Sequence, residues 1–412
     1  MNILIVGSGG REHALASSFK RSKKVKKVFV APGNSGMKDV ATIINIDYLN
    51  QDELIKFAKE NEIDLTVIGP EIALSRGIAD AFMKAGLKVF GPTKAAAKIE
   101  TSKTFAKELM SKYNIPTAKS CTFDSKDKAK SYIEKHTMPI VLKQDGLCAG
   151  KGVYICYSTE EVTKVLDSID VSVDNRLLVE EFLSGFEFSL MAFVSHDIVI
   201  PMEVAQDHKC AYDNDLGPNT GGMGAYSPVK KITKEIIKEA TEKVMIPAAK
   251  ALIDNGSPFV GFLYGGLMLC DDGIKTIEFN ARFGDPEAQV ILPRLESDIL
   301  DVILTLMRNE TPTLKWSNDT TIGVVLAGSK YPKSSSHDFI IEGLADVKSD
   351  IYHMGTTFKN NTYQTNGGRV LCVVSRGKNL REAYDLVYKD IKKIKCDDLV
   401  YRSDIGKKDW EE

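Results

Sequence analysis

The chain has 412 residues, a length that allows two to four domains, each with its own core. Its 54 basic and 56 acidic residues leave a net charge of -2, which excludes an overall field that attracts nucleic acid or an anionic membrane. The seven cysteines are scattered and never spaced C-x-x-C, which argues against a disulfide framework or zinc site and favours a reducing compartment. With no basic leader and no apolar run of membrane-spanning length, we expect a cytoplasmic enzyme or binding protein.

The first hundred residues repeat a pattern of strand, glycine turn and helix. The apolar run from Asn2 to Val6 leads into Gly7-Ser-Gly-Gly-Arg-Glu-His13 and then a helical pattern. This arrangement suits a phosphate, because glycines let the backbone approach and a helix N-terminus favours an anion. A dinucleotide fold is not expected, since Glu12 replaces the third fingerprint glycine and the strand from Lys27 to Val30 ends without an acid for a ribose hydroxyl. We expect His13 to be solvated or to cap the helix.

Two further strands, at residues 64–68 and 87–90, alternate with helices, which predicts a parallel sheet. Ligands of such sheets bind at the carboxyl ends of the strands, where Gly9, Asn34 and Glu71 lie. The alternative is that the Gly-Pro pairs at these ends merely terminate strands.

A second region begins between residues 100 and 120. The strand from Pro139 to Leu142 leads into Lys143 and a glycine-rich loop ending at Gly152, which predicts backbone N–H groups and lysines placed over phosphates. The loop lacks the spacing of a P-loop. The apolar strand from Leu177 to Leu183 ends among carboxylates and is a candidate wall for adenine and ribose, although surface acids explain the pattern too.

The polar, glycine-rich stretch from Gln206 to Pro228 is predicted to be a long loop that acts as a lid. A helix is expected at residues 233–254, and the next two strands, at 261–269 and 273–280, are predicted to form a hairpin.

The second strand of that hairpin carries the candidate metal ligands. Strand alternation places Glu278 and Asn280 on one face and turns Ile277 and Phe279 into the core. A carboxylate and an amide oxygen suit Mg²⁺ shared with nucleotide phosphates. The alternative is a structural ion pair between Glu278 and Arg282.

The last region reads as a small α+β unit. Strands are predicted at 323–328, 338–341, 351–354 and 369–374, and a helix at 380–394. The turn Asn366-Gly-Gly-Arg369 either brings its arginine to the active cleft or reflects turn chemistry alone.

Over essentially its whole length the chain resembles the glycinamide ribonucleotide synthetase family of the ATP-grasp superfamily. The motifs that carry the resemblance are residues 7–15, 31–34, 69–71, 143–152, 217–228, 278–287 and 366–369. The resemblance implies an α/β protein with an N-terminal parallel-sheet (pre-ATP-grasp) domain at residues 1–100. It also implies an ATP-grasp domain at 101–320 with an ATP lid at about 119–190, and a C-terminal α+β domain at 321–412.

The implied reaction joins glycine to 5-phosphoribosylamine with ATP, through glycyl phosphate, and gives glycinamide ribonucleotide, ADP and phosphate in purine biosynthesis. The resemblance implies a monomer with no nucleic-acid or membrane partner. Alternatives are another ATP-grasp carboxylate-amine ligase or carboxylase, a nicotinamide dehydrogenase and a non-catalytic nucleotide sensor.

The resemblance also implies roles for individual residues. The metal, Mg²⁺ or Mn²⁺, is assigned to Glu278 and Asn280, and the catalytic roles to Arg282 and Lys143. ATP is assigned to Lys103, Lys143, Lys151, Gly152, Glu180, Leu183 and Glu187. The other substrates are assigned to Gly9, Gly10, Arg11, Asn34, Glu71, Asp213, Asn219, Thr220, Arg282, Gly284 and Asp285.

Overall fold

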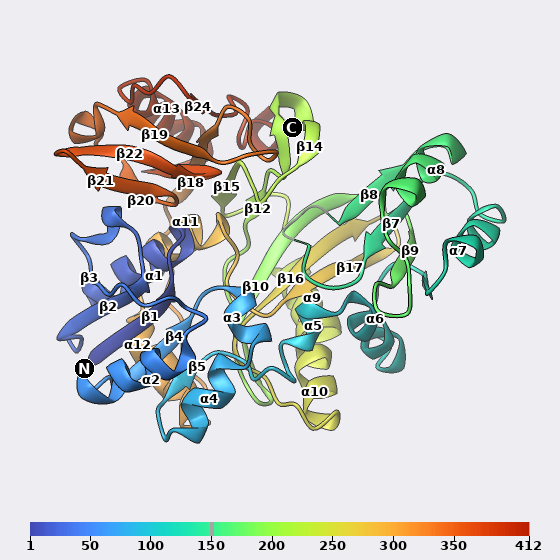
Figure 1. Cartoon of the computed structure of the whole chain (residues 1–412), viewed down its shortest axis with the longest axis horizontal. Coiled ribbons are helices and arrows are strands. Elements are labelled where there is room, and N and C mark those ends of the chain that lie inside the picture. Colours follow the sequence, from blue (N-terminus) through green and yellow to red (C-terminus); the bar gives the residue numbers. More distant parts are fainter. Residues whose placement is uncertain (149–151, 412) are drawn as a thin grey trace.

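The N-terminal part of the chain is the predicted parallel sheet. The computed structural model describes residues 1–148 and 152–411 (Figure 1). Five strands run in the order β3-β2-β1-β4-β5, and every pairing is parallel. The strands are β1 (Asn2–Gly7), β2 (Lys27–Pro32), β3 (Thr42–Ile43), β4 (Leu65–Ile68) and β5 (Val89–Phe90). The helices are α1 (Gly10–Arg21), α2 (Gln51–Glu60), α3 (Glu71–Ser75) and α4 (Ile78–Lys84).

Glu12 explains why the first glycine turn departs from a dinucleotide fingerprint. Its carboxylate folds back onto the turn and accepts a hydrogen bond of 2.6 Å from the Gly9 N–H. It also fills the space beside β4, where a Cβ on Gly69 would lie 1.8 Å from Glu12 Oε1. The turn therefore has a carboxylate beneath it, and Gly69 has to lack a side chain.

The central part contains two antiparallel sheets and the helices beneath them. One sheet has the order β11-β10-β16-β17 and the other β6-β9-β7-β8. The first comprises β10 (Phe186–Ser195), β11 (Ile198–Pro201), β16 (Val260–Cys270) and β17 (Gly273–Asn280). The second comprises β6 (Ser120–Phe123), β7 (Ile140–Gln144), β8 (Val153–Cys156) and β9 (Leu177–Glu181). The helices are α5 (Lys98–Thr101), α6 (Lys103–Lys112), α7 (Lys126–Ile133), α8 (Thr159–Ser168), α9 (Lys234–Ala240) and α10 (Ile246–Asp254), the last two joined by a π-helical turn at residues 241–245.

The predicted hairpin of β16 and β17 is present, but the predicted alternation along β17 is wrong at one residue. Glu278 pairs with Gly266 and Thr276 with Leu267, so Ile277 is an extra residue in a bulge. Ile277 is consequently only half-buried at the cavity described below, whereas Phe279 is buried as predicted, although it borders the cavity too.

The prediction of a long loop at residues 206–228 is also wrong. This stretch contains β12 (Gln206–Asp207), β13 (Cys210–Tyr212), β14 (Leu216–Asn219) and β15 (Gly224–Ser227). All four residues of β15 are buried, and the strand pairs with β18 of the C-terminal sheet. A buried strand at one end of the stretch, paired with β12 at the other end, does not fit a lid that moves as a whole.

The C-terminal sheet has the order β12-β15-β18-β23-β20, so it uses strands from both sides of residue 320. The domain boundaries therefore stay a prediction. Its later strands are β18 (Thr320–Gly328), β20 (Asp350–His353), β23 (Arg369–Gly377) and β24 (Leu399–Val400). A small sheet of β19 (Ser336–Ile341), β22 (Thr362–Gly367) and β21 (Thr356–Lys359) lies beside it, and β21 and β22 were not predicted. The helices are α11 (Glu287–Ile291), α12 (Ile299–Met307), α13 (Leu380–Ile391) and α14 (Lys408–Glu411).

Within the described parts of the chain, no helix has the length and apolarity needed to cross a membrane.

The expectation for His13 is wrong, because His13 is buried between α1 and β20. Its Nδ1 accepts a hydrogen bond of 2.9 Å from the His353 N–H. Burial, and after it the neighbouring His353, lowers the pKa of His13 to about 3. Burial likewise lowers the pKa of His353 to about 4, and burial followed by Arg402 lowers the pKa of His208 to about 4.

These three histidines predict acid lability. Each has a folded-state pKa below its unfolded value, so the unfolded chain takes up the extra protons and stability falls as pH drops from about 6.5 to about 4. Each histidine should contribute a loss of about 1.4 kcal/mol per pH unit in that window. Urea unfolding at several pH values measures the slope. His353→Gln should reduce it by one such increment, and exposed His136→Gln should not. Equal slopes in both variants would contradict this account.

Candidate active site

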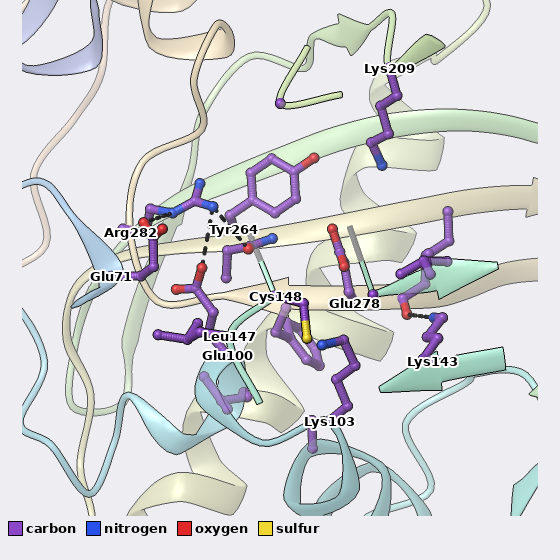
Figure 2. A pocket seen from close by; sticks show the side chains of 18 of the residues that line it. Glu71, Glu100, Lys103, Lys143, Leu147, Cys148, Lys209, Tyr264, Glu278 and Arg282 are labelled. Carbon is purple, nitrogen blue, oxygen red and sulfur yellow. Dashed lines mark hydrogen bonds and ion pairs between the residues drawn. The ribbon is translucent and has the colours of Figure 1, made fainter. Parts of the chain in front are cut away.

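A cavity of about 400 Å³ lies where the N-terminal, central and C-terminal parts of the chain meet (Figure 2). The assigned residues that line it are Arg11, Glu71, Lys103, Lys143, Gly152, Glu180, Thr220, Glu278, Asn280, Arg282 and Asp285. The assigned residues outside its lining are Gly9, Gly10, Asn34, Leu183, Glu187, Asp213, Asn219 and Gly284. Lys151 lies outside the described residues.

One wall is built by the strand that precedes the glycine loop. Lys143, near the end of β7, directs its Nζ to Glu180 Oε2 on β9 at 3.0 Å and to the Ile277 carbonyl at 3.1 Å. Lys107 on α6 approaches the other oxygen of Glu180 at 3.3 Å. Burial lowers the pKa of Lys107 to about 8, although Glu180 acts in the opposite direction. Glu180 thus holds two lysines in place, and Lys143 stays at the cavity wall.

Asp145 anchors the start of the glycine loop to α6. Its Oδ1 accepts hydrogen bonds from the backbone N–H groups of Lys103 at 2.6 Å and Gly146 at 2.9 Å. The Lys103 Nζ donates to the Gly146 carbonyl at 2.8 Å. A helix N-terminus, a glycine loop and a lysine are thereby joined at one edge of the cavity, as expected for a phosphate site.

Glu278 is the carboxylate that faces the open cavity. Among the described residues, no hydrogen bond or ion pair engages its side chain. Figure 2 shows Lys103, Lys143 and Lys209 around it. Burial works to raise the pKa of Glu278, but the three lysines outweigh burial and lower it. Glu278 is therefore charged, and its oxygens are available to a ligand.

Arg282 is held by carboxylates other than Glu278. Its Nε lies 3.1 Å from Glu71 Oε2, and its Nη2 lies 3.2 Å from Glu100 Oε1 and 3.3 Å from Asn280 Oδ1. Burial works to lower the pKa of Arg282, but Glu100 and Glu71 outweigh it and raise the pKa. The alternative of a structural pair between Glu278 and Arg282 is therefore wrong for the described structure.

Glu100 was missed by the sequence analysis. It lies on the short helix α5, and its Oε2 accepts a 2.7 Å hydrogen bond from the Ala281 N–H. Burial raises the pKa of Glu100 to about 7, with Arg282 opposing the shift. No local motif marks Glu100, because it reaches Arg282 only through the tertiary fold.

Arg11 and Glu71, which follow the carboxyl ends of β1 and β4, line the opposite side of the cavity, whereas Gly9 and Asn34 at the same edge of the sheet lie outside its lining. Arg11 donates from Nη1 to the Phe283 carbonyl at 3.1 Å and pairs with Glu12 at 2.7 Å. The side-chain amide of Asn34 donates to the carbonyls of Ser8 at 2.7 Å and His353 at 2.9 Å. Asn34 thus holds the glycine turn, and both of its amide donors are used within the protein.

Further polar residues line the cavity without having been assigned to it, among them Asp207, Lys209, Tyr264 and Glu287. Lys209 forms an ion pair with Glu187. Ser189 donates to Glu287 Oε1 at 3.0 Å and shares a 2.9 Å hydrogen bond with the Tyr264 hydroxyl. The Asp207-His-Lys209 triplet was visible in the sequence, but its placement depends on β12, which was not predicted.

Arg369 reaches the cavity from β23, so the first of the two readings of its turn is confirmed. It donates to the carbonyls of Asp285 at 2.6 Å and Gly221 at 2.5 Å. Its Nη2 lies 3.5 Å from the Asp285 carboxylate. Burial works to raise the pKa of Asp285, but Arg369 and then Arg11 outweigh it and lower the pKa.

Comparison with known proteins agrees with this geometry. The chain matches the family profiles of phosphoribosylglycinamide synthetase, with its N domain at residues 1–100, its ATP-grasp domain at 101–288 and its C domain at 321–408. It is 50% identical to a phosphoribosylamine–glycine ligase of Halalkalibacterium halodurans, over 99% of this chain and 97% of that one. It is 48% identical to the enzyme of that name from Lactococcus lactis, over 98% and 99% of the two chains.

Comparison with solved structures also finds a phosphoribosylamine–glycine ligase. The crystal structure of phosphoribosylamine–glycine ligase from Thermotoga maritima is similar with a TM-score of 0.87 and 31% identity, over 98% of this chain and 100% of that one. The biotin carboxylase domain of a Hydrogenobacter thermophilus 2-oxoglutarate carboxylase shares the fold with a TM-score of 0.72 but only 15% identity, over 97% and 91% of the two chains. The chain belongs to the phosphoribosylglycinamide synthetase family, with its N-terminal parallel sheet, central ATP-grasp domain and C-terminal domain.

Proposed function

We propose that the chain is an ATP-dependent ligase that joins glycine to 5-phosphoribosylamine and releases ADP and phosphate. Relatives that align over almost the whole chain bear the name of this ligase. The observation that supports the proposal most is the Glu278 carboxylate, which has no hydrogen bond or ion pair with a described residue and lies near Lys103, Lys143, Lys209 and Arg282. Such a site suits a triphosphate and a metal ion together.

The donor set fits a hard divalent cation. Glu278 offers a charged carboxylate without a protein partner among the described residues, and Asn280 offers an amide oxygen on the same strand. No cluster of three or more acidic, histidine or cysteine ligands occurs within residues 1–148 and 152–411. Two oxygens match Mg²⁺ or Mn²⁺, whose remaining positions go to phosphates and water. When bound there, the ion neutralises phosphate charge.

The lysines and Arg282 have distinct tasks. Lys103 and Lys143 hold the phosphates from the glycine-loop side, while the carboxylate oxygen of glycine attacks the γ-phosphorus and the bond from phosphorus to the ADP oxygen breaks. Arg282, already charged and fixed by Glu71 and Glu100, stabilises the transferring phosphoryl group. The amine nitrogen of phosphoribosylamine then attacks the acyl carbon of glycyl phosphate, phosphate leaves with the bonding electron pair, and the nitrogen loses a proton.

Asp207 suits the ammonium group of glycine. Its Oδ1 is buried and accepts no hydrogen bond from the described residues. Burial, followed by the neighbouring Glu287, raises the pKa of Asp207 well above its usual range even though Lys209 and Arg369 act in the opposite direction, so a further positive charge close to Oδ1 would stabilise the ionised carboxylate. A bound ammonium group supplies that charge, and the glycine carboxylate then points towards the phosphate side of the cavity.

Asp207→Asn is expected to raise the KM for glycine by about tenfold to a hundredfold, because an ionic hydrogen bond is lost. The KM for ATP should change little. Initial rates at varied glycine and varied ATP measure both, with exposed Asp272→Asn as the matched control. A rise confined to the KM for phosphoribosylamine would indicate that Asp207 contacts the amine of phosphoribosylamine and not the ammonium group of glycine.

ADP formation tests the proposed function directly. Purified protein should form ADP only when glycine, phosphoribosylamine, ATP and Mg²⁺ are all present. ADP formation that is independent of glycine, or that responds to bicarbonate instead, would favour another ATP-grasp ligase or a carboxylase. ATP binding without turnover would indicate a sensor.

We further propose that the enzyme is a cytoplasmic monomer. Size-exclusion chromatography with light scattering can check the oligomeric state.

A further inference from the structure

A small hairpin beside the cavity stands apart from the larger sheets of the described structure. Strands β13 and β14 pair with each other and, in the described structure, with no other strand. Two-stranded hairpins are marginally stable on their own in water. Both ends of this one continue into the cavity wall, at Lys209 before β13 and at Thr220 after β14. The Thr220 N–H and hydroxyl each donate to the Lys209 carbonyl at 2.8 Å, so the hairpin and these two residues move together.

The tip of the hairpin is strained and is held from outside. Asn214 and Asp215 have φ values of 59° and 54°, in the left-handed region. Residues other than glycine rarely adopt this region, although asparagine and aspartate tolerate it best. The Asn214 N–H donates to Asp404 Oδ2 at 2.8 Å, and Asp215 forms an ion pair of 2.9 Å with Arg402. Both partners belong to residues 399–408, which we call the C-terminal tail; Figure 1 shows β14 beside the end of the chain.

Arg402 is the centre of this contact. Its side chain is 1% exposed. Its guanidinium donates to the Cys210 carbonyl at 3.0 Å, to Asp215 at 2.9 Å and to both oxygens of Asp404 at 2.8 Å. The Tyr388 hydroxyl on α13 donates to the Arg402 carbonyl at 2.6 Å and ties the tail to the C-terminal domain. A buried guanidinium with this many partners holds the hairpin and the tail in one relative position, because moving either away would leave a buried charged group without its hydrogen bonds.

Asp213 makes a second contact of the same kind. Its Oδ1 accepts from the Ser403 N–H at 2.8 Å, and its Oδ2 accepts from the Ser403 hydroxyl at 2.5 Å. Both oxygens of Asp213 are therefore engaged by the tail, and the residue is outside the cavity lining.

We propose that the C-terminal tail positions the hairpin and, through it, Lys209 and Thr220 at the cavity. Asp213, Ser403 and Arg402 are positioning residues in this arrangement, and they do not touch substrate. The inference rests on the proposed function, because its activity assay measures the proposed ligase reaction.

A double-mutant cycle tests the contact between Asp213 and Ser403. Asp213→Ala and Ser403→Ala should each lower kcat/KM by about fivefold or more, because the cavity residues at the ends of the hairpin are misplaced. The double variant should be no worse than Asp213→Ala, since Asp213→Ala already removes both hydrogen bonds to Ser403, whereas Ser403→Ala removes only the one from the hydroxyl. Exposed Ser111→Ala on α6 is the control and should match the unaltered enzyme. If Asp213 contacted substrate, Asp213→Ala would lose activity while Ser403→Ala kept it, and that result would overturn the proposal.

Hydrogen exchange provides a second measurement that does not depend on the substrates. Amides of residues 210–219 should exchange faster in Ser403→Ala and in Arg402→Met than in the unaltered protein, and Arg402→Lys should lie between. Faster exchange without any change in kcat/KM would overturn the proposal, because the hairpin would then not position the cavity. If the unaltered enzyme does not use glycine, the proposed function is wrong, and the hydrogen-exchange measurement alone tests whether the tail holds the hairpin. In that case, unchanged exchange of residues 210–219 in Ser403→Ala would reject the tail contact.

Discussion

Glu278→Gln is expected to lower kcat by about a thousandfold while the fold stays intact. The substitution removes the one carboxylate charge that faces the cavity between three lysines, and a neutral amide holds a divalent cation poorly there. Because no hydrogen bond or ion pair from a described residue engages the Glu278 side chain, the change breaks no such contact. ADP formation with all substrates present measures the loss, and circular dichroism with thermal unfolding checks the fold.

The matched control is Glu60→Gln on α2, whose side chain is 62% exposed. It should leave kcat unchanged. Glu278→Asp keeps the charge but shortens the side chain, so it should retain more activity than glutamine and should need more Mg²⁺ for half-maximal rate. Full turnover by Glu278→Gln in Mg²⁺ would show that this carboxylate is not a metal ligand.

The parts of the fold that could be predicted from sequence are those set by local pattern. The parallel N-terminal sheet follows from apolar strands alternating with helices, and its β1 is buried along nearly its whole length. The hairpin of β16 and β17 follows from two apolar strands around Asp271-Asp-Gly273. Lys143 lies in the strand that leads into the glycine loop, as predicted, and it lines the cavity; its role towards ATP stays a prediction.

The parts that were missed depend on contacts distant in sequence. Strands β12 and β13 have only two and three residues; β12 pairs with β15, and Arg402 of the C-terminal tail donates to the Cys210 carbonyl on β13. The bulge at Ile277 depends on its partner strand, which a single strand's pattern does not reveal. Glu100 has no motif at all, yet it pairs with Arg282 across 182 positions of the sequence.

Arg282→Met is expected to lower kcat by about a thousandfold and to destabilise the fold at the same time. Arginines that stabilise a transferring phosphoryl group contribute about 10³-fold or more. The change also leaves Glu71 and Glu100 without their cation, and breaking a buried pair costs about 3–5 kcal/mol. Steady-state kinetics and urea unfolding at pH 8 measure the two effects separately.

The two roles of Arg282 can be separated through Glu100. Burial already raises the pKa of Glu100 to about 7 against the opposing effect of Arg282, so losing the arginine raises this pKa further and charging Glu100 at pH 8 becomes costly. Adding Glu100→Gln removes that charge and keeps an oxygen to accept from the Ala281 N–H. The double variant should therefore regain much of the lost stability without regaining turnover. Recovery of turnover would mean that Arg282 serves only to neutralise its glutamates, and that another group stabilises the phosphoryl transfer.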